Sequence, residues 1–378
     1  MKKRVLIVQA MMKQYRVPFF DGLYKALQQE GIELRVVYGN PPASEEKKQD
    51  NVELGEPCGR KIRNRWLMGE RLLLQSIFGE VRRADLVIVE QASKNLMNYI
   101  LFLLSALGLR KVAYWGHGYD RKRIPGSISE RWKRRLINRV DWWFAYTRGT
   151  AEYLRGCGVP EEIITTVYNS IDTKVFKEAL DAVAPSALKE ARNTLGMDEG
   201  TKIGLYCGAL YREKHIGFLL EAAARIRETL PEFELLVIGG GPEEGDVKEA
   251  AQVHPWVHYL GPQFGHEKAL CFRLAHVSLH PGAVGLAILD SFAAGLPMIT
   301  TNIPGHGPEK EYLEDGVNGL IPPHDPELYV GEVVRLLKDE ARLAGMRGNA
   351  LESGKRYSIE TMVEYFKNGI VDCLSLRS

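Results

Sequence analysis

One segment of the sequence combines the residue types that hold a phosphorylated ligand. Residues 280–301, HPGAVGLAILDSFAAGLPMITT, read as the end of a strand, a glycine turn, a helix and a second buried strand. Gly285 lies where the helix should begin, so a ligand can approach backbone N–H groups that carry partial positive charge. Asp290 lies one turn deeper, where its carboxylate can reach the hydroxyls of a sugar. The segment therefore indicates a site for a nucleotide or a nucleotide-sugar.

Two basic residues come earlier in the chain, after another strand. Lys214 ends the stretch GLYCGALYREK and is expected to open the next helix, where its ammonium group can contact a diphosphate. Arg212, two residues before it, can add a second positive charge. A solvated lysine at a helix start is the alternative, but the presence of Gly285 and Asp290 favours the phosphate interpretation.

Three further residues follow strands and can contact a sugar or an acceptor. His117 lies between two glycines in YWGHGYD, so its imidazole can exchange a hydrogen bond with a sugar hydroxyl, although a structural role is equally open. Glu311, in GPEKEYLEDGVNGLI, can hold a ribose or sugar hydroxyl, and helix capping at the surface is the equal alternative. Arg16, in QYRVPFF, comes just after the first strand and can contact an acceptor or a phosphate.

Other motifs argue against several kinds of site. The glycines in IGGGPEE lack the third glycine and the later acidic residue of a dinucleotide fingerprint, so we expect a turn and no NAD site. His254 and His258 have i,i+4 spacing, but Pro255 separates them, which argues against a shared metal ion. The sequence has no GxSxG motif, no Walker lysine motif and no glycosidase-like carboxylate pair. We therefore expect neither a metal nor a cofactor.

These residues need a framework of alternating strands and helices to position them. Continuous apolar runs predict parallel strands that are buried on both faces. The predicted strands cover residues 4–9, 34–38, 86–90, 111–115, 142–146, 164–168, 202–207, 233–238, 257–260, 277–280 and 297–300. The predicted helices include residues 19–29, 96–107, 217–230, 267–274, 286–294 and 327–339. The alternation predicts two doubly wound α/β domains with ligands at the carboxyl ends of the strands.

The bulk composition is that of a soluble globular protein. The chain has 378 residues, 45% of them hydrophobic and 26% charged, a length that favours two domains. Its five cysteines form no CxxC pair, which favours a reducing compartment. The first residues, MKKRVLIVQAMMK, fit a buried strand better than a signal peptide, and no apolar run is long enough to span a membrane. A cytoplasmic protein is therefore expected.

The net charge of +2 conceals an uneven distribution. Residues 1–170 carry a net charge of +11, and the rest of the chain carries −9. Residues 60–83 and 121–144 concentrate the excess and interleave Arg and Lys with apolar residues at roughly helical spacing, as in helices that lie on an anionic bilayer. A solvated basic face on a core helix is the alternative. Nucleic acid is disfavoured as a partner, because the chain contains no recognisable nucleic-acid module.

The ordered set of segments resembles a family 4 retaining glycosyltransferase with the GT-B fold over nearly the whole chain. The segments that carry this resemblance are GALYREKHIGFLLEAAARI, FELLVIGGGPEE, VHYLGPQ, VGLAILDSFAAGLPMITT and EYLEDGVNGLIPP. VYNSIDTKVF is similar to the stretch that closes the first domain, with Ser170 in place of a glycine, and YSIETMVEYFKNGI to the final helix that crosses back to that domain. The resemblance implies two Rossmann-like domains facing each other across a cleft.

The resemblance gives each domain a role. Residues 1–170, together with the final helix at 358–378, would form the acceptor-binding domain. Residues 201–357 would form the domain that binds the nucleotide-sugar donor. The polar, Ala-rich segment 171–200 is interpreted as the linker between them.

The resemblance also implies roles for individual residues. Lys214 matches the phosphate-binding lysine, and Gly285 and Leu286 match the backbone turn at the donor diphosphate. Asp290 stands at the second glutamate of the Glu-x7-Glu motif, which holds the nucleotide ribose. His117 resembles the first-domain histidine near the donor sugar. These matches make His117, Lys214 and Asp290 the predicted catalytic residues.

The second domain matches the family pattern only in part. Gln263 and Phe264 fall near the loop that frames the base, as the pattern requires. Counting back eight residues from the second motif position reaches Gly282, so the first glutamate is missing and the loop looks shortened. The arginine that usually precedes the lysine by five residues is Ala209, and Arg212 is a candidate to replace it. The contacts of the donor sugar should therefore differ from the family pattern.

The expected reaction is transfer of a hexosyl group from a nucleoside diphosphate sugar to an acceptor hydroxyl, with retained configuration. The resemblance implies same-face attack without a metal ion, with the leaving phosphate taking the acceptor's proton. The expected acceptor is a sugar or a lipid-linked sugar of a surface polysaccharide or glycolipid, at the inner face of an anionic membrane. The alternatives are a nucleotide-sugar epimerase or an inverting transferase on the same fold, and a silent nucleotide-sugar-binding partner.

Overall fold

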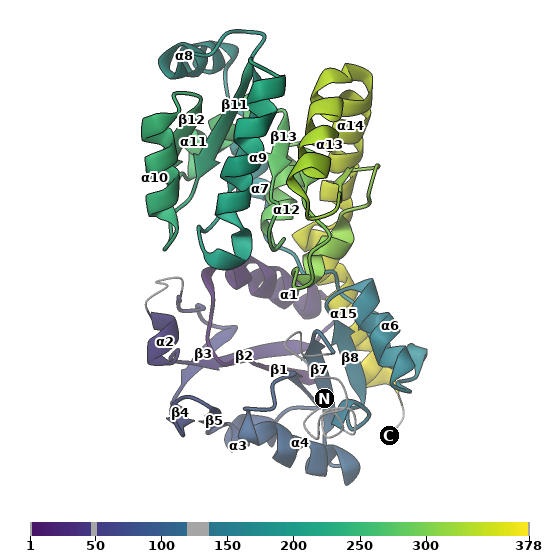
Figure 1. The fold of residues 1–378 in the computed structure, drawn as a ribbon. Helices are drawn as coiled ribbons and strands as arrows, with labels where there is room; N and C mark the ends of the chain where they lie inside the picture. The colour runs from purple at the N-terminus through teal and green to yellow at the C-terminus, as the bar shows by residue number, and fades with distance from the viewer. Residues whose placement is uncertain (1, 47–50, 119–135, 377–378) are drawn as a thin grey trace. The chain divides into compact units, whose positions relative to one another are not determined.

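The chain folds into two units with separate hydrophobic cores. The computed structural model describes residues 2–46, 51–118 and 136–376. Unit 1 comprises Met1–Asp172 and Ile359–Ser378, and unit 2 comprises Thr173–Ser358. The C-terminal helix α15 therefore belongs with the first half of the chain (Figure 1).

Unit 1 is built on a parallel sheet. Within the described residues, seven strands follow the order β3-β2-β1-β6-β7-β8-β9, and neighbouring strands run parallel. The strands are β1 (Arg4–Val8), β2 (Glu33–Gly39), β3 (Gly59–Ile62), β6 (Leu86–Glu90), β7 (Lys111–Gly116), β8 (Trp142–Ala145) and β9 (Ile164–Thr166). Six of these strands confirm the predicted ones. The short edge strand β3, GRKI, was not predicted because it has no apolar run.

Helices cover both faces of this sheet. On one face, α1 (Val17–Gln29) and α15 (Ile359–Ser375) pack together, and the ring of Phe366 joins their core. On the other face, α4 (Leu96–Ala106) and α6 (Arg148–Gly156) contribute to a second core. The strands are therefore buried from both sides, which explains their continuous apolar sequences.

The basic segment 60–83 is not an amphipathic helix, so that prediction was wrong. After β3, its residues form the antiparallel hairpin of β4 (Asn64–Leu67) and β5 (Leu72–Gln75), followed by the short helix α3 (Phe78–Val81). Half-buried and exposed residues alternate along β4, a period of two that pairing with β5 stabilises. The spacing of Arg and apolar residues in this segment is compatible with both the helical period of about 3.6 residues and the strand period of two. In the other basic segment, residues 121–135 lie outside the described residues, and the end forms β8.

Residues 171–200, which the sequence suggested as a linker, are largely helical. They contain α7 (Lys174–Asp181) and α8 (Pro185–Leu195), and both belong to unit 2. The ring of Phe176 meets that of Phe272 edge-on, with 5.0 Å between the centroids. The Ala-rich composition favours helix, and the apolar side of α7 is buried against its own unit.

Unit 2 repeats the doubly wound plan. Its sheet contains six parallel strands, in the order β12-β11-β10-β13-β14-β15. The strands are β10 (Lys202–Cys207), β11 (Phe233–Ile238), β12 (Val257–Gly261), β13 (Val277–Leu279), β14 (Met298–Ile299) and β15 (Gly319–Leu320). Besides α7 and α8, its helices include α9 (Ile216–Thr229), α10 (Glu244–Val253), α11 (Gly265–Leu274), α12 (Ala287–Ala293), α13 (Pro326–Lys338) and α14 (Glu340–Arg356). No helix in the described part of the chain is long and apolar enough to cross a membrane.

In each unit the strand order reverses at one point. This switch point lies between β1 and β6 in unit 1 and between β10 and β13 in unit 2. Loops that leave the carboxyl ends of two such strands diverge and leave a crevice between them. The loops after β10 and β13 carry Lys214 and Gly285, and the loop after β1 leads to Arg16. The topology therefore brings these predicted site residues to the two switch points.

A glycine in α15 tests how closely this helix packs on its sheet. A β-carbon at Gly369 would overlap Thr165 Oγ1 and lie 2.8 Å from Phe144 Cε1. We expect Gly369→Ala to lower the free energy of unfolding by about 1–3 kcal/mol, although alanine is the better helix former, because ring and hydroxyl must move. Chemical unfolding followed by circular dichroism measures the change.

The matched control is Gly345→Ala in α14. A β-carbon there has no neighbouring heavy atom within 4 Å. This variant should be neutral or more stable by up to about 1 kcal/mol, because alanine loses less conformational entropy than glycine in a helix. Equal effects of the two substitutions would contradict the close packing of α15.

Candidate active site

The loop after β13 lies against the backbone of the loop after β10. A β-carbon at Gly282 would lie 2.6 Å from the carbonyl oxygen of Glu213 and closer still to the carbonyl group of Lys214. The N–H of Ala283 donates to the Glu213 oxygen at 2.7 Å. No side chain fits at position 282 in this arrangement of the two loops, so the position requires glycine.

Lys214 is held by this contact between the two loops. It ends the short 3-10 helix Arg212–Lys214, is 9% exposed, and donates from Nζ to the carbonyl oxygen of Ala283 at 2.5 Å. Burial lowers the pKa of the ammonium group, and the charges of Glu309 and Glu213 oppose that shift. A lysine ammonium group has three N–H donors, so two can serve a ligand while one binds the carbonyl.

The backbone turn at Gly285 is open. The N–H groups of Gly285 and Leu286 donate to no other residue that the structure describes, and nothing lies within 4 Å of a β-carbon at position 285. The preceding residue, Val284, is fixed from both sides. Its N–H donates to His306 Nδ1 at 3.1 Å, and its carbonyl accepts from the N–H of Gly307 at 2.7 Å. The turn is therefore positioned while its own amides stay available to an anion.

Asp290 is the fourth residue of α12, and its carboxylate forms an ion pair. Lys268 of α11 donates from Nζ to Asp290 Oδ2 at 2.7 Å, and both side chains are mostly buried. Sequence reasoning missed Lys268, because nothing in its spacing links it to Asp290. The ion pair places a hydrogen-bond acceptor, the carboxylate, beside a hydrogen-bond donor, the ammonium group. Such a pair can bind two neighbouring hydroxyl groups.

A carboxylate beside Lys214 comes from Glu309, not from the predicted Glu311. Glu309 lies in the 3-10 helix Pro308–Tyr312 and is 6% exposed. A β-carbon at Gly307 would lie 2.5 Å from Glu309 Oε2 and 3.4 Å from the Cα of Gly285, so the carboxylate lies near the open turn. Glu311 is exposed on the same short helix. Sequence reasoning missed Glu309, because nothing in the sequence says which glutamate faces inward.

The remaining donor-side residues lie nearer the surface of unit 2. Arg212 is exposed at the start of its 3-10 helix. Gln263 donates from Nε2 to the carbonyl oxygen of Leu260 at 2.5 Å, which braces the loop after β12. Phe264 precedes α11 and is 77% exposed, so its ring is free to stack on a planar group.

In unit 1, Arg16 is buried in an aromatic cluster. Its guanidinium carbon lies 4.2 Å from the Trp115 ring centroid, and one amino group donates to Tyr146 Oη at 2.8 Å. Burial lowers the pKa of the guanidinium group, but its interactions with Tyr146, Tyr15 and Glu90 outweigh burial and leave the pKa raised. Burial raises the pKa of the Glu90 carboxyl, and Arg16 opposes that shift. Arg16 is therefore a fixed cation near the switch point of unit 1.

His117 joins this cluster through Tyr146. The two rings meet edge-on, with 4.2 Å between their centroids. Since the Tyr146 hydroxyl accepts from Arg16, one tyrosine links the two residues that were predicted separately. Sequence reasoning missed Tyr146, although its place at the end of a predicted strand was an available signal.

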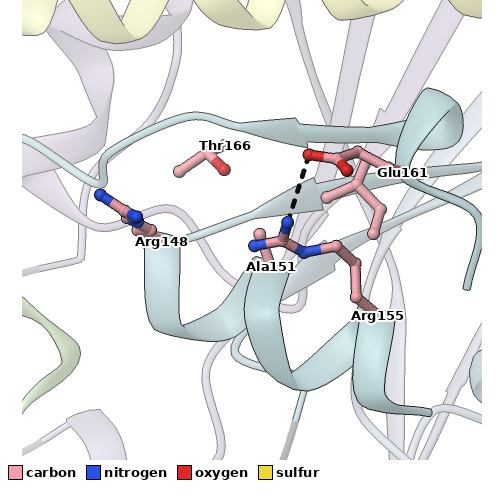
Figure 2. A pocket seen from close by; sticks show the side chains of 6 residues that line it. Arg148, Ala151, Arg155, Glu161 and Thr166 are labelled. Atoms are coloured by element: carbon pink, nitrogen blue, oxygen red, sulfur yellow. Dashed lines mark hydrogen bonds and ion pairs between the residues drawn. The ribbon is translucent and has the colours of Figure 1, made fainter.

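A separate pocket in unit 1 contains none of the predicted residues. Figure 2 shows this cavity of about 250 Å³, which is lined by Arg148, Ala151, Arg155, Glu161, Ile164 and Thr166. Arg155 pairs with Glu161 at 3.3 Å, and Arg148 pairs with Glu152 at 3.1 Å. Because both guanidinium groups already have carboxylate partners, we assign no ligand to this pocket.

His280 follows β13 and is buried near Lys214. It is 2% exposed and stacks on the Tyr206 ring, with 4.7 Å between the centroids. Neither of its ring nitrogens has a hydrogen-bond partner among the residues that the structure describes. Burial lowers the pKa of His280 to about 3, and the charge of Lys214 acts in the same direction.

This histidine should make the stability of the protein depend on pH. In the unfolded chain its pKa is near 6.5, so between pH 6.5 and 3 the unfolded state binds more protons and stability falls as the pH falls. At pH 5 the loss is about 2 kcal/mol. We expect His280→Leu to lose this part of the pH dependence, measured by urea unfolding at pH 7.5 and pH 5. An unchanged difference between the two pH values would show that His280 is not buried in the neutral form.

The fold of the chain is that of known sugar transferases. HepE from Anabaena, whose structure was solved in complex with UDP, is 17% identical to this chain and matches it with a TM-score of 0.69, over 98% of this chain and 99% of HepE. A glycosyltransferase from Rickettsia africae is 13% identical, with a TM-score of 0.71 over 100% of both chains. These similarities define the GT-B fold, with its two Rossmann-like units.

Comparison of sequences gives the family. The model of Glycosyltransferase Family 4 matches residues 19–175, and the model of Glycosyl transferases group 1 matches residues 201–339. Together the two models match most of the chain, which is a glycosyltransferase of the family 4 type.

Curated relatives are similar to parts of the chain. A D-inositol 3-phosphate glycosyltransferase of Nocardiopsis dassonvillei is 27% identical over 228 residues, which is 56% of this chain and 51% of the relative. A second enzyme of that name, from Catenulispora acidiphila, is 26% identical over 299 residues, 74% of this chain and 67% of the relative. The match to the first of these relatives thus spans only about half of its length.

Proposed function

We propose that this protein transfers a sugar from a nucleoside diphosphate sugar to an acceptor hydroxyl, with retention at the anomeric carbon. One observation carries the proposal: the buried ammonium group of Lys214 lies at the Ala283 carbonyl, two residues before the open amides of Gly285 and Leu286. Together these groups offer positive charge in one crevice. A leaving diphosphate gains negative charge as the reaction proceeds, so the site stabilises the transition state more than the ground state.

The chemistry follows from this charge arrangement. The bond between the anomeric carbon and the phosphate oxygen breaks while the acceptor oxygen bonds to the same face of that carbon. The acceptor's proton passes to the leaving phosphate oxygen. Because Lys214 and the turn neutralise the diphosphate, with Arg212 as a further cation, the reaction needs no metal ion or cofactor.

We propose a uridine diphosphate sugar as the donor. Solved structures with this fold contain UDP or UDP-glucose, which supports the choice. In unit 2, the exposed ring of Phe264 would stack on the base near Gln263, and Asp290 with Lys268 would hold the ribose. Glu309, buried beside Lys214, would accept hydrogen bonds from the hydroxyls of the transferred sugar.

The acceptor is proposed to bind to unit 1. Arg16, held by Tyr146, supplies a fixed cation, and His117 lies in the same cluster. The net charge of +11 in residues 1–170 supports an acceptor at an anionic membrane surface. We therefore propose a lipid-linked sugar of a surface polysaccharide or glycolipid as the acceptor, and the cytoplasmic face of the cell membrane as the place of reaction.

Replacement of Lys214 tests the phosphate site. Lys214→Met keeps the buried stem and removes the charge, so the protein should fold. We expect UDP to bind at least tenfold more weakly in calorimetry, and kcat/KM for transfer from UDP-glucose to fall about 10²- to 10³-fold.

The matched control removes the same charge elsewhere in unit 2. Lys338→Ala, at the exposed end of α13, should leave both measurements unchanged. Full UDP affinity in Lys214→Met would overturn the assignment of the diphosphate to this turn.

The stereochemistry of the product tests the reaction class. With UDP-glucose and a crude lipid-linked acceptor extract, the coupling constant of the new anomeric proton in NMR should report an α-linkage, the configuration of the donor. The rate should be the same in EDTA as in magnesium. A β-linked product would indicate an inverting transferase, and UDP binding without turnover would indicate a silent binding partner.

A further inference from the structure

A stripe of large aliphatic side chains lies on the outer face of α4. Ile100 and Leu103 of α4 and Leu107, which caps its C-terminus, follow i, i+3, i+7 spacing and are 37%, 60% and 61% exposed. Leu109, in the turn after the helix, is 54% exposed. The helix carries no charged residue. An uncharged helix with this exposed stripe is costly in water unless another phase or surface covers it.

Arginine residues border one end of this stripe. Arg110, just after α4, donates from Nε to the carbonyl of Val81 at 2.9 Å and from one amino group to the carbonyl of Arg82 at 2.6 Å. These bonds hold the end of α3 beside the end of α4, which adds exposed Arg82 and Arg83 to the border. Phe78, the first residue of α3, is 53% exposed.

Acidic side chains near this border do not cancel its charge. Glu80 of α3 forms an ion pair with Arg60, and Asp85 forms one with Lys3 at 3.5 Å. Asp141, near Leu109 and Arg110, accepts from Ser105 Oγ and from the N–H of Val112, both at 2.8 Å, and is outnumbered by the arginines. The local excess of positive charge is therefore carried by arginines that face solvent.

The β4–β5 hairpin extends this surface at the other end of α4. Leu73 N–H donates to the carbonyl of Lys94 at 2.8 Å, which joins β5 to the segment just before α4. At the hairpin tip, Leu67 is 41% and Met68 is 72% exposed, and Arg65 and Arg71 on either side are exposed as well. Figure 1 shows β4, β5, α3 and α4 along the same edge of unit 1.

We infer that this surface, formed by the outer face of α4, the α3 end and the hairpin tip, docks on an anionic phospholipid bilayer. Apolar side chains such as Leu103 would enter the headgroup region while the bordering arginines contact lipid phosphates. Charge complementarity selects this occupant, because a protein partner would have to offer both an apolar groove and a surrounding acidic border. This surface would be the place at which the membrane contact of the proposed function occurs. The docking itself rests on the proposed function only in that the acceptor there is lipid-linked.

Co-sedimentation with vesicles tests the docking surface. The full chain should bind vesicles of phosphatidylcholine with phosphatidylglycerol and bind pure phosphatidylcholine much more weakly. Leu103→Ser with Leu107→Ser should lower the partition coefficient at least tenfold. Arg82→Gln with Arg83→Gln should lower it about fivefold for each arginine and reduce its dependence on salt.

The control variants distinguish failure of membrane docking from failure of the proposed transferase function. Val175→Ser with Val253→Ser removes two valines that are 68% and 66% exposed in unit 2, and should leave vesicle binding unchanged. UDP affinity and the melting temperature should be the same in all variants, so failure of the nucleotide site would be seen independently. Undiminished vesicle binding of the Leu103 and Leu107 variant would overturn the inference. Loss of a dimer from this variant in light scattering would also do so, because the surface would then join two copies of the chain.

Discussion

The close contact between two loop backbones is the constraint on which the site of unit 2 depends. Gly282 lies so near the main chain of Lys214 that no side chain can occupy position 282. The same contact brings the Ala283 carbonyl to the lysine ammonium group, which is thereby buried at a fixed point. The turn at Gly285 follows within three residues and keeps its amides unbonded within the described chain. A larger residue at position 282 would push the two loops apart and break the contact between the Lys214 ammonium group and the Ala283 carbonyl.

Both units bury a cation near the switch point of their sheets, but the two cations are stabilised differently. Burial lowers the pKa of the Lys214 ammonium group, and the charge of Glu309 opposes that shift only in part. Arg16 lies over an aromatic ring and donates to Tyr146. A guanidinium group cannot lose its proton in a protein, whereas an ammonium group has a charge that its surroundings can tune. In the proposed function, this difference would give unit 1 a fixed charge for the acceptor and unit 2 a tunable charge for the leaving diphosphate.

Much of the fold could be predicted because buried parallel strands leave a strong local signal. The apolar runs RVLIV and FELLVI predict β1 and β11 from the local sequence alone. The helix prediction for residues 60–83 was wrong because their alternating basic and apolar residues are compatible with a strand as well as a helix. Only the pairing of β4 with β5 decides between the two. The strand β15 was missed for a related reason: two residues carry no periodicity, and its neighbour β14 defines it.

The sequence alone determined the type of fold and the identity of the residues that follow its strands, such as Lys214 and Gly285. Apolar periodicity and glycine positions are local properties, so they can be read along the chain. Only the tertiary structure decided that Glu309 faces inward instead of Glu311, that Lys268 pairs with Asp290, and that the stripe of α4 meets the arginines after α3. Each of these depends on contacts between residues far apart in the sequence, for which local spacing carries no information.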